Sequence, residues 1–354
     1  MPRLIDVAER ASVSVSVVSR VVSGDSSLRI RGDTRERVLR AVRDLGYTQN
    51  HAGRALRLQR SGAIALLVPD VNNAIFSEVS RGVEIGAAGS DLVMLLGRSE
   101  WLDPENNLAT RLCQQGRIDG LIVQLRDEEQ SPEILDLLPP GVPAVLMNWH
   151  QHRGLSSVAI DDEEAARVAT SFLVDLGHCE IGLIGGFAQT STARAREAGY
   201  RRALVAAGIR RRAEWTTRLG YTPAAGRAAF AKLLMAPRLP SALVVSNVNA
   251  AVGVLSAARD AQIDVPGQLS IVTVHDTWIA EHVSPALTTV RVPTYDLGVE
   301  AARVLIRVMQ GGPKRYVVVR DPAPVLVPRR SHAPGPFAKD AVTGQWKTVA
   351  ATDA

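Results

Sequence analysis

Apolar positions in the first 46 residues recur at the spacing of helices. Intervals of three and four residues indicate an amphipathic helix, because 3.6 residues make one turn. Two such stripes are regular, one at Leu4, Ile5, Ala8 and Ala11 and the other at Val38, Leu39, Val42 and Leu45, with Gly46 ending the second. We therefore predict a helix near each end of this segment.

Between these stripes, the run ASVSVSVVSR alternates like a half-buried strand. The alternation stops at Val18, and Val18, Val21 and Val22 follow helical spacing. Ser14 is a good N-cap, and valine lowers helix propensity by only about 0.5 kcal/mol, which packing can override. We predict a third helix, whose exposed side carries Val15, Ser16, Val17, Ser19 and Arg20.

From residue 64 onward, short apolar runs alternate with helical patterns. Strands separated by helices form parallel sheets covered on both faces, so this pattern predicts an α/β body. Eight strands over about 270 residues favour two subdomains. The runs are IALLVPD at 64–70, DLVMLLG at 91–97, GLIVQ at 120–124, PAVLMN at 143–148, SVAID at 157–161, IGLIGG at 181–186, ALVVSN at 242–247 and SIVTVHD at 270–276.

Two segments show no regular period. Residues 47–61, YTQNHAGRALRLQRS, are basic, and Asn50 could cap a short helix that would be mostly unfolded alone. The tail at 335–354 is irregular, and we predict that it is disordered. It carries no heptad pattern, which argues against a coiled-coil tetramer.

Composition narrows the class of protein. Hydrophobic residues make up 46% and charged residues 22%, an ordinary globular balance. No apolar run could span a membrane and no secretory signal is visible, so we expect a cytoplasmic protein. Cys113 and Cys179 lie in no ligand motif, and we expect no metal and no cofactor.

Positive charge is concentrated at one end of the chain. Residues 1–60 carry twelve Arg, no Lys and six acidic residues, a net charge of +6, whereas the rest sums to −1. A basic head suggests contact with a polyanion such as nucleic acid, although a solvated basic face is equally open on charge alone.

Motifs in both parts resemble those of the lac repressor (LacI/GalR) family of transcription regulators. In the head and connector they are Val7-Ala8, Val13-Ser14, Val18 to Val22 followed by Gly24, Thr34 to Val38, Gly46-Tyr47, Asn50, and Arg54 to Leu56. In the body they are IALLVPD at 64–70, DGLIV at 119–123, LGHCEIGLIGG at 176–186, RxxGY at 196–200, VPGQLSIV at 265–272 and PALTTVRVP at 285–293. The set falls in the family's order over roughly residues 3–332.

The resemblance implies a helix-turn-helix head at 1–46 that reads a pseudo-palindromic operator as part of a homodimer, on the nucleoid when bound. Arg20 would donate a bidentate pair to guanine, with a phosphate contact as the alternative. Val17 stands where the family usually has a hydroxyl residue, so one phosphate contact is expected to be missing. The matching DNA-binding positions are Ser14, Val15, Ser16, Val17, Arg20, Asn50, His51 and Leu56.

Residues 47–61 match the family's hinge helix, which folds when two subunits sit on DNA. Leu56 would then be a wedge in the minor groove that bends the duplex, or else an ordinary packing leucine. Gln49 replaces the usual proline, and we expect a more flexible hinge. Folding on binding would couple the body to DNA affinity.

The body at 62–334 would have two doubly wound parallel-sheet subdomains of periplasmic-binding-protein type, with the chain crossing near 161 and 290. Its effector would bind between them, at the carboxyl ends of strands. A sugar or sugar derivative is expected, or a nucleoside or nucleobase. The matching effector-binding positions are Ile75, Phe76, Asn148, Arg196, Tyr221, Asn247 and His275.

Two departures concern the effector. His275 and Val248 stand where many family members have aspartate, and we expect an effector that carries a phosphate, a carboxylate or a base ring. The alternative is a ligand-independent architectural protein with a vestigial pocket. An enzyme is not expected, because GLIGG at 182–186 lacks the G-x-G-x-x-G spacing and no nucleophile, P-loop or zinc motif occurs.

Overall fold

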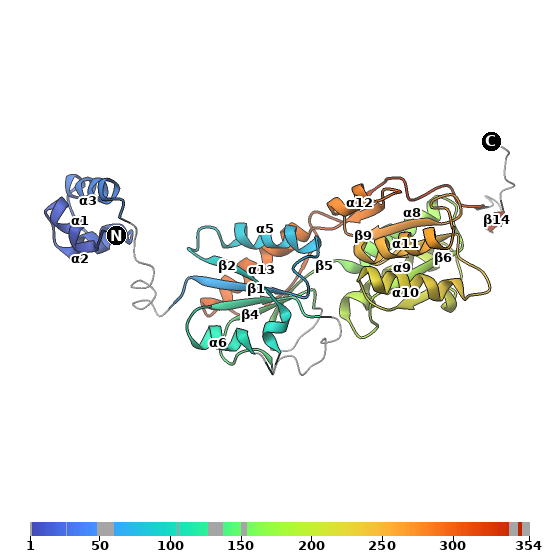
Figure 1. Cartoon of the computed structure of the whole chain (residues 1–354), viewed down its shortest axis with the longest axis horizontal. Coiled ribbons are helices and arrows are strands. Elements are labelled where there is room, and N and C mark those ends of the chain that lie inside the picture. The colour runs from blue at the N-terminus through green and yellow to red at the C-terminus, as the bar shows by residue number, and fades with distance from the viewer. Residues whose placement is uncertain are drawn as a thin grey trace. The chain divides into compact units, whose positions relative to one another are not determined.

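The chain folds into two compact units, Met1–Ser61 and Gly62–Ala354 (Figure 1). The computed structural model describes residues 2–25, 27–47, 60–103, 105, 107–126, 137–149, 154–339 and 346–348. Each unit has its own apolar core, so each is described by itself.

The first unit contains the three predicted helices, α1 (Leu4–Ala11), α2 (Val15–Val22) and α3 (Gly32–Leu45). They meet around Val7, Val18 and Val38, which are completely buried. Ser14 caps α2, because its Oγ accepts from the Val17 N–H at 3.3 Å. The alternating serine and valine run is therefore helical, since packing of its valines overrides their strand preference.

All eight predicted strands of the second unit are present. They are β1 (Ala63–Val68), β2 (Val93–Arg98), β3 (Gly120–Val123), β4 (Ala144–Met147), β5 (Ser156–Ile160), β6 (Ile181–Gly185), β8 (Ala242–Val245) and β9 (Ser270–Val274). In the two large sheets, four further strands were not predicted, because they are short and three of them are largely half-exposed, so that their apolar pattern is weak. These are β7 (Thr216–Arg218), β10 (Thr288–Arg291), β11 (Tyr316–Val319) and β12 (Val325–Val327).

The strands form two six-stranded sheets, as predicted for two parallel-sheet subdomains. The first has the order β11-β5-β4-β3-β1-β2 and is parallel throughout. The second has the order β12-β10-β9-β8-β6-β7, with only β12 antiparallel to its neighbour. Strands such as β1, β8 and β9 are buried along their whole length, which explains their continuous apolar runs.

Helices cover the sheets of both subdomains (Figure 1). The first subdomain has α5 (Ile75–Ala87), α6 (Leu108–Gln114), α13 (Thr294–Met309) and the 3-10 turn η1 (Ser99–Leu102). The second has α8 (Asp162–Asp175), α9 (Ser191–Ala206), α10 (Pro223–Leu234), α11 (Val248–Asp260), α12 (Trp278–His282) and the 3-10 turn η3 (Ala213–Trp215).

The chain passes between the two sheets three times. It crosses after β5, after β10, and again between β11 and β12. The sequence predicted passages near 161 and 290 but not the third, at 320–324, because the two short strands that flank it were not predicted. The third passage ends in the antiparallel strand β12.

The C-terminal tail differs from its prediction of disorder. Segments β13 (Phe337–Lys339) and β14 (Trp346–Thr348) pair as a two-stranded antiparallel sheet. Just before β13, the Gly335 N–H donates to Leu176 O at 2.7 Å, and at its first residue the Phe337 N–H donates to Gly177 O at 3.2 Å. The prediction is wrong for these residues, because backbone bonds to a distant part of the chain replace the missing local pattern.

Candidate functional site

The start of α2 presents the predicted base-reading face of the first unit. Val15 and Ser16 are exposed, which leaves their side chains accessible. Val17 was predicted to be exposed but is half-buried, and it packs against the core of the three helices. Ser14 Oγ accepts a hydrogen bond from the Val17 N–H and thereby caps α2.

Arg20 lies one turn further along α2 and is bound to the loop that follows. Its Nε donates to Asp25 Oδ2 at 2.7 Å, and its Nη2 donates to Ser27 Oγ at 3.1 Å. Hydrogen bonds from Ser27 and Arg20 lower the pKa of Asp25 to about 2. The predicted positions Asn50, His51 and Leu56 lie outside the described residues.

In the second unit, Arg196 is the centre of a buried polar cluster. This side chain is 4% exposed, and its Nε donates to Asp162 Oδ1 at 2.8 Å. Its Nη1 donates to the carbonyl of Ser246, at the end of β8. The guanidinium also lies 5.6 Å from the centroid of the Tyr221 ring. Asp162 therefore compensates the positive charge of Arg196 inside the protein.

His275 completes this cluster from the carboxyl end of β9. Its Nε2 lies 3.5 Å from Arg196 Nη2, and its backbone has a left-handed φ of 72°. Because the arginine nitrogen can only donate, Nε2 accepts and Nδ1 carries the hydrogen. Among the described residues, no hydrogen-bond partner faces this buried Nδ1. Burial lowers the pKa of His275 to about 3, so the ring is uncharged at neutral pH.

Tyr221 reaches the cluster because a glycine leaves room for its ring. A Cβ at Gly186 would lie 2.3 Å from Tyr221 Oη, closer than any side chain could tolerate. This glycine follows β6, so the end of that strand is shaped to accept the aromatic ring.

Two predicted asparagines have structural contacts. Asn247 Oδ1 accepts from the Ala250 N–H at 3.0 Å and caps α11. The Asn148 carbonyl accepts from Ser191 Oγ at 3.1 Å and Thr192 Oγ1 at 3.3 Å. These contacts join the end of β4 in the first subdomain to the start of α9 in the second.

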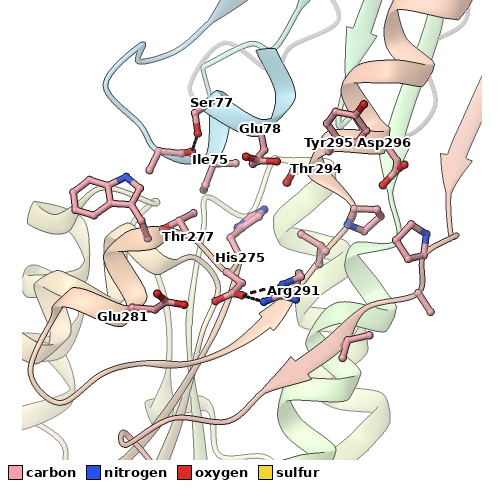
Figure 2. A pocket seen from close by; sticks show the side chains of 18 residues that line it. Ile75, Ser77, Glu78, His275, Thr277, Glu281, Arg291, Thr294, Tyr295 and Asp296 are labelled. Atoms are coloured by element: carbon pink, nitrogen blue, oxygen red, sulfur yellow. Dashed lines mark hydrogen bonds and ion pairs between the residues drawn. The ribbon is translucent and has the colours of Figure 1, made fainter. Parts of the chain in front are cut away.

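A cavity of about 640 Å³ lies beside this cluster. Figure 2 shows the His275 ring rising toward the end of α5 that carries Ile75 and Glu78. Phe76 is half-buried and packs against the core instead. Of the seven predicted effector positions, only Ile75 and His275 line the cavity; the lining also includes Asp276, Thr277, Trp278, Glu281, Arg291, Thr294, Tyr295 and Asp296.

Charges on the cavity wall are largely paired. Arg291 Nη2 lies 2.6 Å from one oxygen of Asp276, and Arg329 Nη2 lies 2.7 Å from the other. Burial alone would raise the pKa of Asp276, but hydrogen bonds from Arg291, Arg329 and Thr289 outweigh it and hold the pKa below its usual value. The carboxylate is thus fixed as part of the wall.

Sequence reasoning missed Asp162, Asp276 and Ser246. Ser246 and Asp276 lie in the last residues of the predicted runs 242–247 and 270–276, and Asp162 follows the run 157–161. All three are therefore at the carboxyl end of a strand, where polar groups gather in parallel sheets. That signal could have identified Asp162, which lies two residues beyond β5. The pairing of Asp162 with Arg196 joins residues from two different helices and is not visible in local pattern.

The described residues hold neither a metal-binding cluster nor a membrane-spanning helix. Within these ranges, no group of three His, Cys, Asp or Glu side chains is arranged to hold a metal ion. No helix in the same part of the chain is long and apolar enough to cross a membrane.

Comparison with known proteins gives concordant matches. Residues 3–50 match the model for bacterial regulatory proteins of the lacI family, and residues 170–332 match that of a periplasmic binding protein-like domain. Catabolite control protein A of Priestia megaterium is 32% identical over 309 residues, covering 86% of this chain and 92% of that protein.

Solved structures give the same result. A LacI family transcriptional regulator from Mycobacterium smegmatis is 40% identical with a TM-score of 0.72, covering 77% of this chain and 99% of that one. The lac repressor dimer bound to operator and an anti-inducer is 25% identical with a TM-score of 0.74, covering 93% and 98%.

Proposed function

The chain belongs to the lacI family of bacterial regulatory proteins, and from this premise we propose that it represses transcription under the control of a small effector. It is a DNA-binding transcriptional regulator in which the first unit binds DNA and the second responds to a ligand. The buried Arg196–His275 cluster, placed beside a cavity, is the observation that carries the ligand-binding half of this proposal.

DNA binding is assigned to the exposed start of α2. Val15 and Ser16 are accessible there, Val15 for apolar contact with a thymine methyl and Ser16 for base or phosphate bonds. Arg20 would read a base, and the net charge of +6 over residues 1–60 would attract the duplex. Ser14, Val17, Asn50, His51 and the wedge Leu56 complete the proposed contacts. Val17 would contribute only its exposed part, because its side chain packs inward.

The proposed effector is an uncharged sugar, nucleoside or nucleobase. Asp162 already compensates Arg196, and burial keeps His275 neutral, so this cluster has no free positive charge for a phosphate or carboxylate. Of the groups that the sequence suggested, this favours a base ring over the two anions. Ile75 and His275, which line the cavity, would contact it from the two subdomains. Arg196, Tyr221, Asn247, Phe76 and Asn148 are proposed as further effector positions, although they do not line this cavity.

We propose a homodimer that forms through the body. Strand β2 lies at the edge of its sheet, where Val93, Leu95 and Leu96 are exposed by 58%, 40% and 43%. Ile85 on the neighbouring α5 is 56% exposed. An apolar group of this kind is typical of a surface covered by a partner. A twofold dimer would also match the two half-sites of a pseudo-palindromic operator.

Selection of random double-stranded DNA by the purified full-length protein tests the DNA-binding half. We expect an inverted repeat whose half-sites lie about one helical turn apart. Failure to enrich any repeat would contradict the assignment of the head.

The ligand-binding half is tested with the enriched site as probe. Monosaccharides, disaccharides, nucleosides and purine bases would be screened for a shift in thermal unfolding and in DNA affinity. We expect an uncharged compound to change both, and replacement of His275 by asparagine to weaken the response. If only phosphorylated compounds act, the neutral-effector assignment is wrong. A ligand-independent architectural protein, which the family comparison does not favour, would respond to none.

A further inference from the structure

Arg20, Asp25 and Ser27 form a closed ring of hydrogen bonds at the end of α2. Arg20 donates from Nε to Asp25 Oδ2 at 2.7 Å and from Nη2 to Ser27 Oγ at 3.1 Å. Asp25 Oδ1 in turn accepts from the Ser27 N–H at 2.9 Å and from Ser27 Oγ at 2.7 Å. Each of the three side chains is thus held by the other two.

The end of α2 places Asp25 where it can reach back to Arg20. Gly24 adopts a left-handed φ of 68°, which turns the chain out of the helix. The Asp25 N–H then donates to the Arg20 carbonyl at 3.0 Å, so backbone and side chains join the same two residues. The ring is therefore built on a defined helix end rather than on a free loop.

These contacts use one edge of the guanidinium and leave the other available. Arginine has five N–H groups, of which the ring takes the one on Nε and one on Nη2. Both N–H groups on Nη1 and the second N–H group on Nη2 remain. A guanine edge accepts one hydrogen bond from each of these two nitrogens. The Arg20 side chain as a whole is still 43% exposed.

We propose that Asp25 and Ser27 are positioning residues that hold Arg20 in its base-reading orientation. The inference rests on the proposed function, because it takes α2 as the helix that faces DNA. A long arginine side chain loses rotamer freedom when it binds, and the ring removes that freedom before DNA arrives. Asp25 and Ser27 thereby sharpen sequence discrimination without touching a base.

The ring could also act in the opposite sense. An ion pair that had to break before Arg20 reached DNA would make Asp25 a competitor of the operator. Its removal would then strengthen binding. The two mechanisms predict effects of opposite sign for the same variant.

The test begins with the sites that the full-length wild-type protein enriches from random DNA. Selection with Arg20→Ala identifies the symmetric base pair whose preference depends on Arg20. Asp25→Ala should relax the preference at that same base pair by about tenfold, within the range of one bidentate contact, and leave the other positions unchanged. Ser27→Ala should relax it less. Asp44→Ala is the matched control, because it removes one exposed carboxylate from α3 outside the ring.

A double-mutant cycle supplies a second readout. In the Arg20→Ala background, Asp25→Ala should have no further effect on discrimination, because the two residues act through one contact. Thermal unfolding would verify that the head of each variant is folded.

Three results would overturn the proposal. The first is tighter operator binding by Asp25→Ala. The second is an equal change in affinity for all DNA sequences that Asp44→Ala reproduces. The third is that the effects of Arg20→Ala and Asp25→Ala on discrimination add in the double-mutant cycle. Failure of the wild-type protein to enrich any repeat would instead remove the proposed function, and with it this inference.

Discussion

At the residue scale, the body is organised around a charge that it buries completely. Arg196 and Asp162 have side-chain exposures of 4% and 0%, and their closest oxygen–nitrogen distance is 2.7 Å. A buried ion pair of this kind adds little stability relative to apolar side chains, but losing one partner leaves the other charge uncompensated. We therefore infer that the ion pair serves to fix the geometry of the Arg196 cluster.

We expect Asp162→Asn to lower the free energy of unfolding of the body by about 3 kcal/mol, because Arg196 would remain buried without a counter-charge. Glu164→Gln is the matched control on the same helix. Glu164 forms an ion pair with Arg167, and both side chains are about one-third exposed. The control should change the free energy by less than about 1 kcal/mol. Denaturant unfolding measures both, and equal losses would contradict the special status of Asp162.

His275 makes the stability of the body depend on pH. Burial lowers its folded pKa to about 3, while an unfolded histidine titrates near 6.5. Between these values the unfolded chain binds a proton that the folded chain does not, so stability falls as pH drops through this window. His275→Asn removes this contribution, and asparagine tolerates the left-handed backbone.

Between pH 7 and pH 5, the wild-type protein should therefore lose roughly 2 kcal/mol more than His275→Asn. Comparing the two proteins cancels the contributions of His178 and His332, whose pKa values burial also lowers. Denaturant unfolding at both pH values measures the difference. Parallel losses in the two proteins would mean that His275 takes up a proton in the folded state.

At the element scale, α5 and α13 lie side by side across the first subdomain because glycines let their backbones meet (Figure 1). A Cβ at Gly82 would lie 2.0 Å from Tyr295 O, and one at Gly298 would lie 2.2 Å from Val79 O. The contact joins the start of the chain's first subdomain to a helix that enters it only after the second passage between the sheets. Close packing at this point therefore links segments more than 200 residues apart.

We expect Gly82→Ala to cost about 1–3 kcal/mol of unfolding free energy, since the added methyl forces two backbones apart. Glu84→Ala lies on the exposed side of the same helix and should stay within about 0.5 kcal/mol of the wild-type protein. Thermal or denaturant unfolding of both variants measures the contrast. If Gly82→Ala left the free energy of unfolding unchanged, α5 and α13 could move apart without cost.

At the scale of the whole molecule, the body combines a ligand-sized cavity with an exposed apolar edge. Three passages of the chain join its two sheets, and the cavity wall includes residues from the second and third of them. A ligand in the cavity would therefore contact the second and third passages. A movement of one subdomain relative to the other would have to bend these passages. The apolar edge at β2 is the proposed dimer surface, through which such a change would reach the DNA-bound heads.

Leu96→Glu should weaken the dimer by about 2 kcal/mol, or about 30-fold in its dissociation constant, because it places a charge on the apolar edge. Operator affinity should fall with it, while binding of effector by one body should persist. Met235→Glu is the control, since Met235 is 86% exposed in the other subdomain. Sedimentation velocity measures the dimer, and an unchanged dissociation constant would place the interface elsewhere.

Local pattern was sufficient for much of the fold. Apolar spacing and capping residues predicted α1, α2 and α3, with Ser14 and Gly46 at their ends, because helix ends depend on near neighbours. The eight predicted strands were evident for a similar reason. Seven of them are buried along their length, and such strands must be apolar throughout. The edge strand β2 is apolar too, although most of it is exposed. The family's motifs predicted positions that would face DNA and ligand, and of the seven effector positions only Ile75 and His275 line the cavity.

Only the tertiary structure decided how distant residues meet. The half-exposed strands β11 and β12, the third passage and the pairing of the tail depend on partners far along the chain, and local pattern does not encode such contacts. Likewise, Arg196 was predicted only as an effector position, and the fold showed that it is paired with Asp162, 34 residues away. The residue types came from the sequence, but the net charge and accessibility of the site came from the fold, because burial and pairing set both.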